Sequence, residues 1–181
     1  KDPYVIGVVT KSRDSEYLRS VCSGMEKAAD EEGVSVLIVS PDTETDVRLQ
    51  KKMIQDLLDK KVDALAVSPI DYYSNADYIK EAKDMGIPVF SYDTQIADAS
   101  VPYIGIDNEK AGRDLAEYMA GQLRGKGKVG IISGDLKQTA HASRIKGFED
   151  YIEKNTDIQV SFVESGYSNL QMSEREISRL M

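Results

Sequence analysis

Residues 4–40 read YVIGVVTKSRDSEYLRSVCSGMEKAADEEGVSVLIVS and contain two β-branched runs separated by one segment of helical length. Tyr4–Thr10 and Val34–Ser40 have the length and composition of buried β-strands. Between them, apolar side chains recur at helical spacing over Glu16–Glu32, and Gly33 can end a helix at little conformational cost. This strand–helix–strand order predicts a parallel βαβ unit, because two parallel strands need a crossover connection.

The same alternation of strand-like and helix-like segments continues along the rest of the chain. The predicted strands are Val62–Ser68, Ile87–Tyr92, Val101–Ile106, Lys128–Ser133 and Ile158–Glu164, and the predicted helices are Thr45–Lys60, Ser74–Met85, Glu109–Leu123, Thr139–Lys154 and Ser168–Met181. Gly125-Lys126-Gly127 is predicted to be a plain turn. The pattern indicates an α/β protein with parallel sheets.

Composition and motifs argue against several classes of protein. The 181 residues carry a formal charge of −8, and nucleic-acid binding requires a basic face. No apolar run approaches the roughly 20 residues of a membrane-spanning helix. Cys22 and His141 are the only cysteine and histidine, so the sequence has no internal disulfide and no zinc-ligand pattern. P-loop, G-x-S-x-G and H-E-x-x-H motifs are also absent from the sequence, and we expect no metal, no cofactor and no catalytic residues.

Five segments, in this order, resemble the type I periplasmic binding proteins, in particular the ribose-binding-like group of sugar receptors. They are the stretch from Tyr4 to Gly33, VDALAVSPID at 62–71, GIPVFSYDTQ at 86–95, VPYIGIDNEKAGRDLAEYM at 101–119 and TAHASRIKGFEDYI at 139–152. No single segment is decisive, but their order and spacing together are specific. The resemblance covers essentially the whole chain.

The resemblance implies two Rossmann-like lobes with parallel sheets, joined by a hinge and facing each other across a ligand cleft. We place the first lobe at residues 1–106 and part of the second at 107–181. Asp107 and Asn108 lie at the crossing, where they can cap the helix that begins at Glu109. The family fold is longer than this chain, so we expect the second lobe to be incomplete. The 181 residues alone are then expected to bind ligand poorly.

Sugar sites combine charged hydrogen-bonding groups for hydroxyls with aromatic faces for C–H surfaces. By resemblance, Asp93 matches a sugar-binding aspartate after the fourth strand, and Arg144 matches an arginine three residues before Gly147-Phe148. The alternatives are a turn aspartate that bonds its own backbone and an arginine on an exposed helix face. Thr94 stands where ribose receptors usually carry arginine, which implies that the ligand need not be ribose.

Six further residues fall at polar or aromatic positions of the family site: Lys11, Ser15, Tyr17, Ser68, Asp135 and Tyr167. Tyr17 matches the first of two aromatic residues that stack on the sugar, although Leu18 replaces the second. A core residue at the helix start is the alternative for Tyr17. Lys11 would suit an anionic ligand or else point to solvent. Tyr167 keeps the aromatic type of its family position, and Ser68 keeps only the polarity.

The resemblance implies a receptor and not an enzyme. Its expected function is to bind a sugar or polyol in the cleft and to deliver it, by hinge closure, to the permease of an ABC importer. The expected location is the periplasm or the cell exterior, with lipoprotein anchoring as an option. Two alternatives keep the fold: the sensor domain of a histidine kinase or chemoreceptor system, and the effector domain of a LacI-type regulator. The DNA-binding headpiece of such a regulator would precede the first strand, where only Lys1-Asp2-Pro3 stand.

Overall fold

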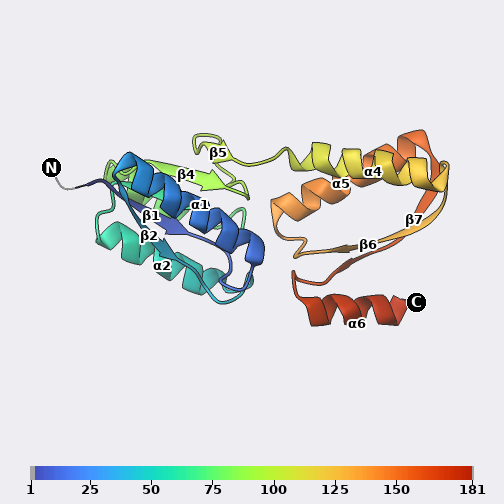
Figure 1. Ribbon diagram of the computed structural model, residues 1–181, viewed down its shortest axis with the longest axis horizontal. Helices are drawn as coiled ribbons and strands as arrows, with labels where there is room; N and C mark the ends of the chain where they lie inside the picture. The colour runs from blue at the N-terminus through green and yellow to red at the C-terminus, as the bar shows by residue number, and fades with distance from the viewer. Residues whose placement is uncertain (1–2, 181) are drawn as a thin grey trace. The chain divides into compact units, whose positions relative to one another are not determined.

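The structure is a computed structural model that describes residues 3–180. The chain divides into two compact units, Lys1–Gly105 and Ile106–Met181 (Figure 1). The described parts of both units are α/β and their strands pair in parallel, as the sequence predicts. Met181, which we predict to end the last helix, lies outside the described residues.

The first unit contains a five-stranded parallel sheet with the order β2-β1-β3-β4-β5. Its strands are β1 (Val5–Val9), β2 (Ser35–Val39), β3 (Ala64–Val67), β4 (Val89–Tyr92) and β5 (Tyr103–Ile104), and its helices are α1 (Glu16–Glu32), α2 (Val47–Asp59) and α3 (Ala76–Asp84). The strand order reverses beside β1, which has β2 on one side and β3 on the other. Loops diverge at such a point and leave a crevice beyond the carboxyl ends of the strands.

Helices cover both faces of this sheet, with α1 and α2 on opposite sides (Figure 1). The larger core joins α2 and α3 to one face and is centred on Val9, Ile54, Leu57, Leu58, Leu65, Val67 and Ile79. The other face packs on α1 through Val8, Ala66, Val21 and Met25. Burial on both faces explains why these strands are continuous apolar runs and do not alternate.

Helix α1 begins and ends where local chemistry predicts. The Ser15 hydroxyl accepts a hydrogen bond from the Leu18 amide at 3.2 Å and so caps the first turn. Gly33 takes the left-handed conformation at φ 67°, and its amide bonds the carbonyl of Ala29. The observed bounds are the predicted ones.

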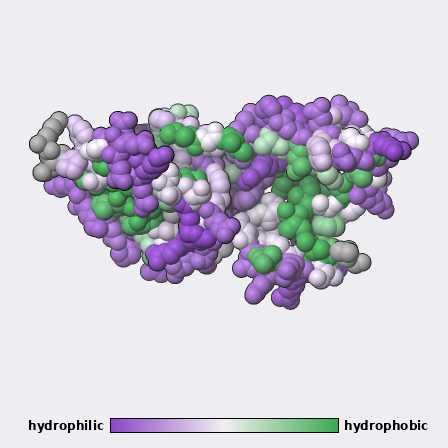
Figure 2. All heavy atoms as spheres, viewed as in Figure 1, coloured by the Kyte–Doolittle hydropathy of each residue, from purple (hydrophilic) through white to green (hydrophobic). Residues whose placement is uncertain are grey.

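The second unit contains α4 (Asn108–Leu123), β6 (Lys126–Ser133), α5 (Thr139–Asn155), β7 (Asp157–Ser165) and α6 (Leu170–Leu180). Figure 1 shows α4 and α5 on one side of the paired strands and α6 on the other. Its core is centred on Ala116, Phe148, Ile152 and Ile158. Several large apolar side chains stay exposed, and Figure 2 shows hydrophobic surface over the strands of this unit.

The turn predicted at Gly125-Lys126-Gly127 is wrong in its extent. Lys126 and Gly127 already belong to β6 and pair with Asp157 and Ile158 of β7. The chain reverses earlier, at Arg124, which takes the left-handed conformation at φ 55°. Pairing with a strand farther along the chain therefore overrides the local glycine signal.

Helices α4 and α5 touch through their backbones at two glycines. A Cβ atom at Gly112 would collide with the carbonyl oxygen of Arg144, and one at Gly147 would collide with the carbonyl oxygen of Glu109. Asp107 caps the start of α4 by accepting a hydrogen bond from the Lys110 amide at 2.9 Å, as predicted. Within residues 3–180 we find no helix that combines the length and the apolarity needed to cross a bilayer.

Candidate functional site

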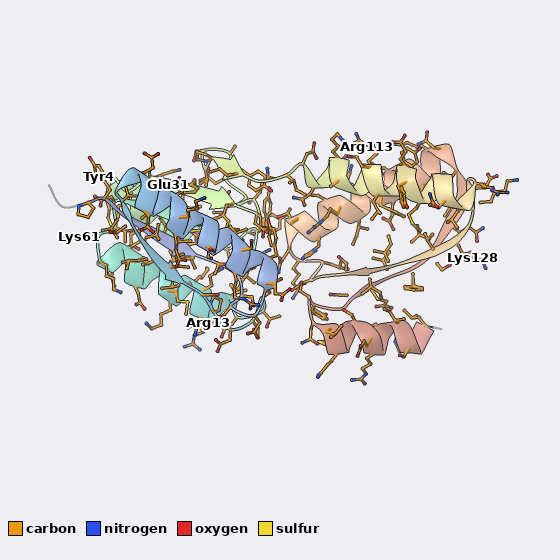
Figure 3. All side chains as sticks on the ribbon, in the orientation of Figure 1. Tyr4, Arg13, Glu31, Lys61, Arg113 and Lys128 are labelled. Carbon is orange, nitrogen blue, oxygen red and sulfur yellow. The ribbon has the colours of Figure 1, made fainter. Side chains whose placement is uncertain are left out.

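Polar side chains gather at the carboxyl ends of three neighbouring strands of the first unit. Lys11 follows β1, Ser68 follows β3, and Asp93 and Thr94 follow β4. Because these strands lie side by side in the order β1-β3-β4, their exits meet at one edge of the sheet. Figure 3 labels Arg13 at this end of the unit. Tyr4 and Lys61, which precede β1 and β3, lie at the opposite end.

Lys11 is the centre of this cluster. Its Nζ lies 2.7 Å from Asp93 Oδ2 and donates to Thr94 Oγ1 at 3.0 Å. The Lys11 side chain is 6% exposed and that of Asp93 is 19% exposed. A buried ammonium is tolerated only with such a partner, because desolvation of an unpaired charge is costly. The alternative in which Lys11 points to solvent is therefore wrong.

The two carboxylate oxygens of Asp93 have different surroundings. Oδ2 accepts from Lys11, from Ser68 Oγ at 3.2 Å and from Thr94 Oγ1 at 3.4 Å. Oδ1 receives no hydrogen bond from any residue in the described range 3–180. The carboxylate is thus held through one oxygen while the other stays available as an acceptor. The side chain bonds other side chains and not its own backbone, contrary to the turn-aspartate interpretation.

The backbone of Asp93 is held in an uncommon conformation. Its φ is 60°, in the left-handed region that few residues other than glycine occupy. The Asp93 amide donates to the carbonyl of Ile104 at 3.0 Å, and the Tyr103 hydroxyl donates to the carbonyl of Asp93 at 3.0 Å. Both contacts come from β5, so the edge strand fixes the direction of this side chain.

A buried tyrosine lies beside the cluster. The Tyr92 hydroxyl donates to the carbonyl of Val9 at 3.3 Å. Burial raises the pKa of Tyr92 well above its usual range, because the phenolate would be poorly solvated. This hydroxyl stays neutral and ties β4 to β1 near the strand ends that Asp93 and Lys11 follow.

Two candidates lie in the connection between β1 and α1. Ser15 uses its hydroxyl to cap α1. Tyr17, in the first turn of that helix, is 61% exposed, so the alternative of a core tyrosine is wrong. Its ring is accessible for contact with a ligand or with solvent.

The second unit carries three candidates on separate segments. Asp135 follows β6, and its Oδ1 accepts from the Lys137 amide at 3.0 Å. Arg144 is exposed on α5, where its Nε donates to the carbonyl of Ala140 at 3.2 Å and its Nη2 lies 3.2 Å from His141 Nδ1. Arg144 and His141 line a cavity of about 480 Å³ with apolar side chains of α4 and β6.

Tyr167 follows β7 at φ 52° and is 43% exposed. No hydrogen bond between side chains joins Asp135, Arg144 and Tyr167 in the part of the chain that the structure describes. The structure therefore joins the first-unit candidates Lys11, Ser68, Asp93 and Thr94 through their side chains. Asp135 and Tyr167 follow the neighbouring carboxyl ends of β6 and β7, where the Ser165 hydroxyl donates to the carbonyl of Gly134 at 2.8 Å, but their own side chains are not bonded to each other.

Sequence reasoning missed Gln50, which reaches the same edge of the first sheet from α2. Its side chain is bonded to the backbone where β1 and β3 end. One signal in the sequence could have revealed it. Gln50 lies at helical spacing with Val47, Ile54 and Leu57, so it is a polar residue within the apolar stripe of the helix.

Residues 6–181 match the family described as "Periplasmic binding protein domain". A D-ribose/D-allose-binding protein of Pseudomonas aeruginosa is 31% identical over 157 residues, which cover 82% of this chain and 49% of that protein. The chain spans about half the length of the curated relatives it matches.

Two solved structures share the fold. An ABC transporter solute binding protein from Burkholderia graminis, in complex with D-arabinose, has a TM-score of 0.94 and 28% identity, and the match covers 99% of this chain and 62% of that one. The fructose binding periplasmic domain of a hybrid two component system has a TM-score of 0.89 and 29% identity, covering 98% and 59% of the two chains.

Proposed function

Because this chain belongs to the periplasmic binding protein domain family, we propose that it is part of a receptor outside the cytoplasm that binds a sugar or polyol and delivers it to an ABC importer. The relatives described above are binding proteins, with D-ribose or D-allose and D-arabinose as named ligands. Such a function makes and breaks no covalent bond, so it requires neither nucleophile nor general base.

The Asp93 carboxylate is the single observation that carries this proposal. One oxygen is anchored by Lys11, Ser68 and Thr94, and the other is left as an acceptor. An oxygen of this kind has lone pairs for two hydroxyl donors, and bonds to a charged acceptor are the stronger ones. Adjacent hydroxyls of a sugar or polyol supply such a pair of donors.

The charge of the cluster favours an uncharged ligand. The Lys11 ammonium and the Asp93 carboxylate are 2.7 Å apart and compensate each other. A sugar acid would bring a second anion to a lysine that is already paired, and like charges close together disfavour binding. This argues against the anionic ligand that Lys11 by itself suggests.

The proposed contacts also include the other sequence candidates. Tyr17 offers an exposed aromatic face for the C–H surface of a sugar. Ser15 stands beside it in the same connection. In the second unit, Arg144 is the proposed guanidinium donor to ligand oxygens, and Asp135 and Tyr167 are proposed as further contacts.

Calorimetric titration of the intact protein tests the function. The panel consists of pentoses, hexoses and polyols, with the corresponding sugar acids as matched anionic controls. We expect saturable binding of at least one neutral sugar or polyol and markedly weaker binding of its acid. Binding of the acids alone, or of none of these compounds, would contradict the proposal.

Replacing Lys11 with methionine tests the charge compensation directly. The variant keeps an unbranched side chain that is shorter by one atom, and it leaves Asp93 without its cation. We expect a loss of about 2 kcal/mol in the free energy of unfolding, because Asp93 stays 19% exposed and the cost falls below that of a fully buried pair. Urea denaturation measures this loss.

The double variant K11M/D93N is the matched control, since it removes both charges together. We expect it to recover most of the lost stability while sugar binding stays weak. If K11M alone is as stable as the natural protein, the ion pair contributes nothing and the charge argument fails.

A sensing role is a second candidate function, favoured by one observation. The fructose binding domain of a two component system is 29% identical to this chain and has the same fold. Transport and sensing share the proposed binding site and differ in the partner. A deletion strain separates them: loss of uptake of labelled sugar indicates transport, whereas intact uptake with lost sugar-dependent gene induction indicates sensing.

A further inference from the structure

We propose that Gln50 is a positioning residue for the ligand-binding cluster and fixes the two loops that carry Lys11 and Ser68. The inference rests on the proposed function, because the affinity it controls is that of the same site. Gln50 belongs to α2 and makes no contact with the ligand in this proposal. It acts through the backbone of the residues that do.

The Gln50 side chain is fully used in hydrogen bonds. Gln50 is 3% exposed. Its Nε2 donates to the carbonyl of Thr10 at 3.1 Å and to the carbonyl of Ser68 at 2.9 Å. Its Oε1 accepts from the Ile70 amide at 2.9 Å. Both amide protons and the carbonyl are therefore used, and each contact is to backbone.

These contacts begin where the sheet ladder stops. Pairing of β1 with β3 ends at Val9 and Val67, and the Ser68 amide makes the last bond, to the carbonyl of Val9 at 2.8 Å. Beyond that point the two strands no longer bond each other in the described residues. Gln50 bridges them instead and holds the carbonyls of Thr10 and Ser68 from one side.

We call the three hydrogen bonds of Gln50 to Thr10, Ser68 and Ile70 the clamp, and it acts directly on the cluster. Lys11 follows Thr10, so fixing the Thr10 carbonyl limits the direction in which the lysine leaves β1. Ser68 is itself a member of the cluster and donates to Asp93 Oδ2. Loss of the clamp frees both loops, and a site displaced by a fraction of an ångström binds less tightly.

Plain packing does not explain a glutamine at this position. Ile54, Leu57 and Leu58 of the same helix are buried and apolar, and an apolar residue would fill the space as well. A buried amide is tolerated because every one of its polar groups is bonded. The hydrogen-bonding pattern is thus the property that the position requires.

The test compares two Gln50 variants with a control on the same helix. Q50M keeps the length and removes all three bonds, whereas Q50E keeps the acceptor and removes both donors. Q55M is the control, because Gln55 also bonds through its amide, to Asp59 Oδ1 and Glu81 Oε1, away from the strand ends. Circular dichroism and urea denaturation establish that each variant is folded.

Hydrogen exchange in the sugar-free protein gives the first readout. We expect Q50M, which removes the acceptor Oε1, to speed exchange of the Ile70 amide by about tenfold or more, while the amides of Val8 and Ala66 in the strand cores are unchanged. Q50E keeps that acceptor and should leave the Ile70 amide protected, and Q55M should change none of these amides. Unchanged exchange of Ile70 in a folded Q50M, or equal loosening of the strand cores, would overturn the positioning role.

Affinity for D-ribose, D-allose and D-arabinose gives the second readout. We expect Q50M to weaken the tightest of these by about 10- to 100-fold and Q55M to stay within about twofold of the natural protein. Q50E should regain affinity as the pH falls, because protonation of the introduced carboxyl restores one donor. A folded Q50M with natural affinity would overturn the inference. If neither these three sugars nor any other neutral compound of the panel binds the natural protein, the proposed function fails alone, since the exchange experiment still decides the role of Gln50.

Discussion

Replacing Asp93 with alanine is expected to abolish the stabilisation of the protein by its sugar. A ligand present at about 100 times its dissociation constant adds about 2.7 kcal/mol to the free energy of unfolding. Asp93 is the proposed charged acceptor, and its removal also leaves the buried Lys11 without the carboxylate that lies 2.7 Å away. Both effects weaken binding, and a lost charged hydrogen bond alone costs about 1.5–3 kcal/mol.

Thermal unfolding with and without sugar measures this effect. D98A is the matched control, because Asp98 lies in the loop after the same strand and bonds Ser100 and Lys83, outside the cluster. We expect D98A to keep the full sugar-dependent shift in the unfolding temperature and D93A to show none. A shift of natural size in D93A would exclude Asp93 as a ligand contact.

A large loss of stability in the second unit is expected from Gly147→Ala. A methyl group there would collide with the carbonyl oxygen of Glu109, and backbone cannot move aside as a flexible side chain can. Helices α4 and α5 would have to separate along their contact. Overpacking of this kind costs about 1–3 kcal/mol and occasionally more, and we expect a value at the upper end.

Urea denaturation followed by far-ultraviolet circular dichroism measures the loss as a lower midpoint. Gly121→Ala is the control, because a Cβ at Gly121 on α4 meets no atom within 4 Å. That substitution should be neutral or stabilising by up to about 1 kcal/mol, since alanine favours the helix over glycine. Equal effects of the two substitutions would show that the close approach of the helices is not a constraint.

Local patterns were sufficient to place the secondary structure of the first unit. Ser15, the apolar spacing of α1 and Gly33 lie within one short stretch, so the bounds Glu16–Glu32 could be predicted to the residue. Parallel pairing also follows from the sequence, because a segment of helical length separates most consecutive strands. The resemblance to the family singled out Asp93 as a site residue. Its position directly after β4 follows from the order of residues along the chain.

The partners of Lys11 could not be predicted in this way. Lys11 and Thr94 are 83 residues apart and meet only because β1, β3 and β4 are neighbours in the sheet. A lysine after a strand has the same local pattern whether it faces solvent, a ligand or a carboxylate. The strand order decided between these possibilities. It placed Lys11, a possible hydrogen-bond donor to an anionic ligand, in an ion pair with Asp93.

Gln50 and Gly127 illustrate the same limit. Gln50 is 40 residues from Thr10, and Gly127 joins β6 only through pairing with Ile158. The sequence by itself determined where helices and strands form and which strands end in polar residues, because capping and hydrophobic spacing act over a few residues. Only the tertiary structure decided which of those polar groups bond one another, because such contacts depend on sheet order and helix placement between distant parts of the chain.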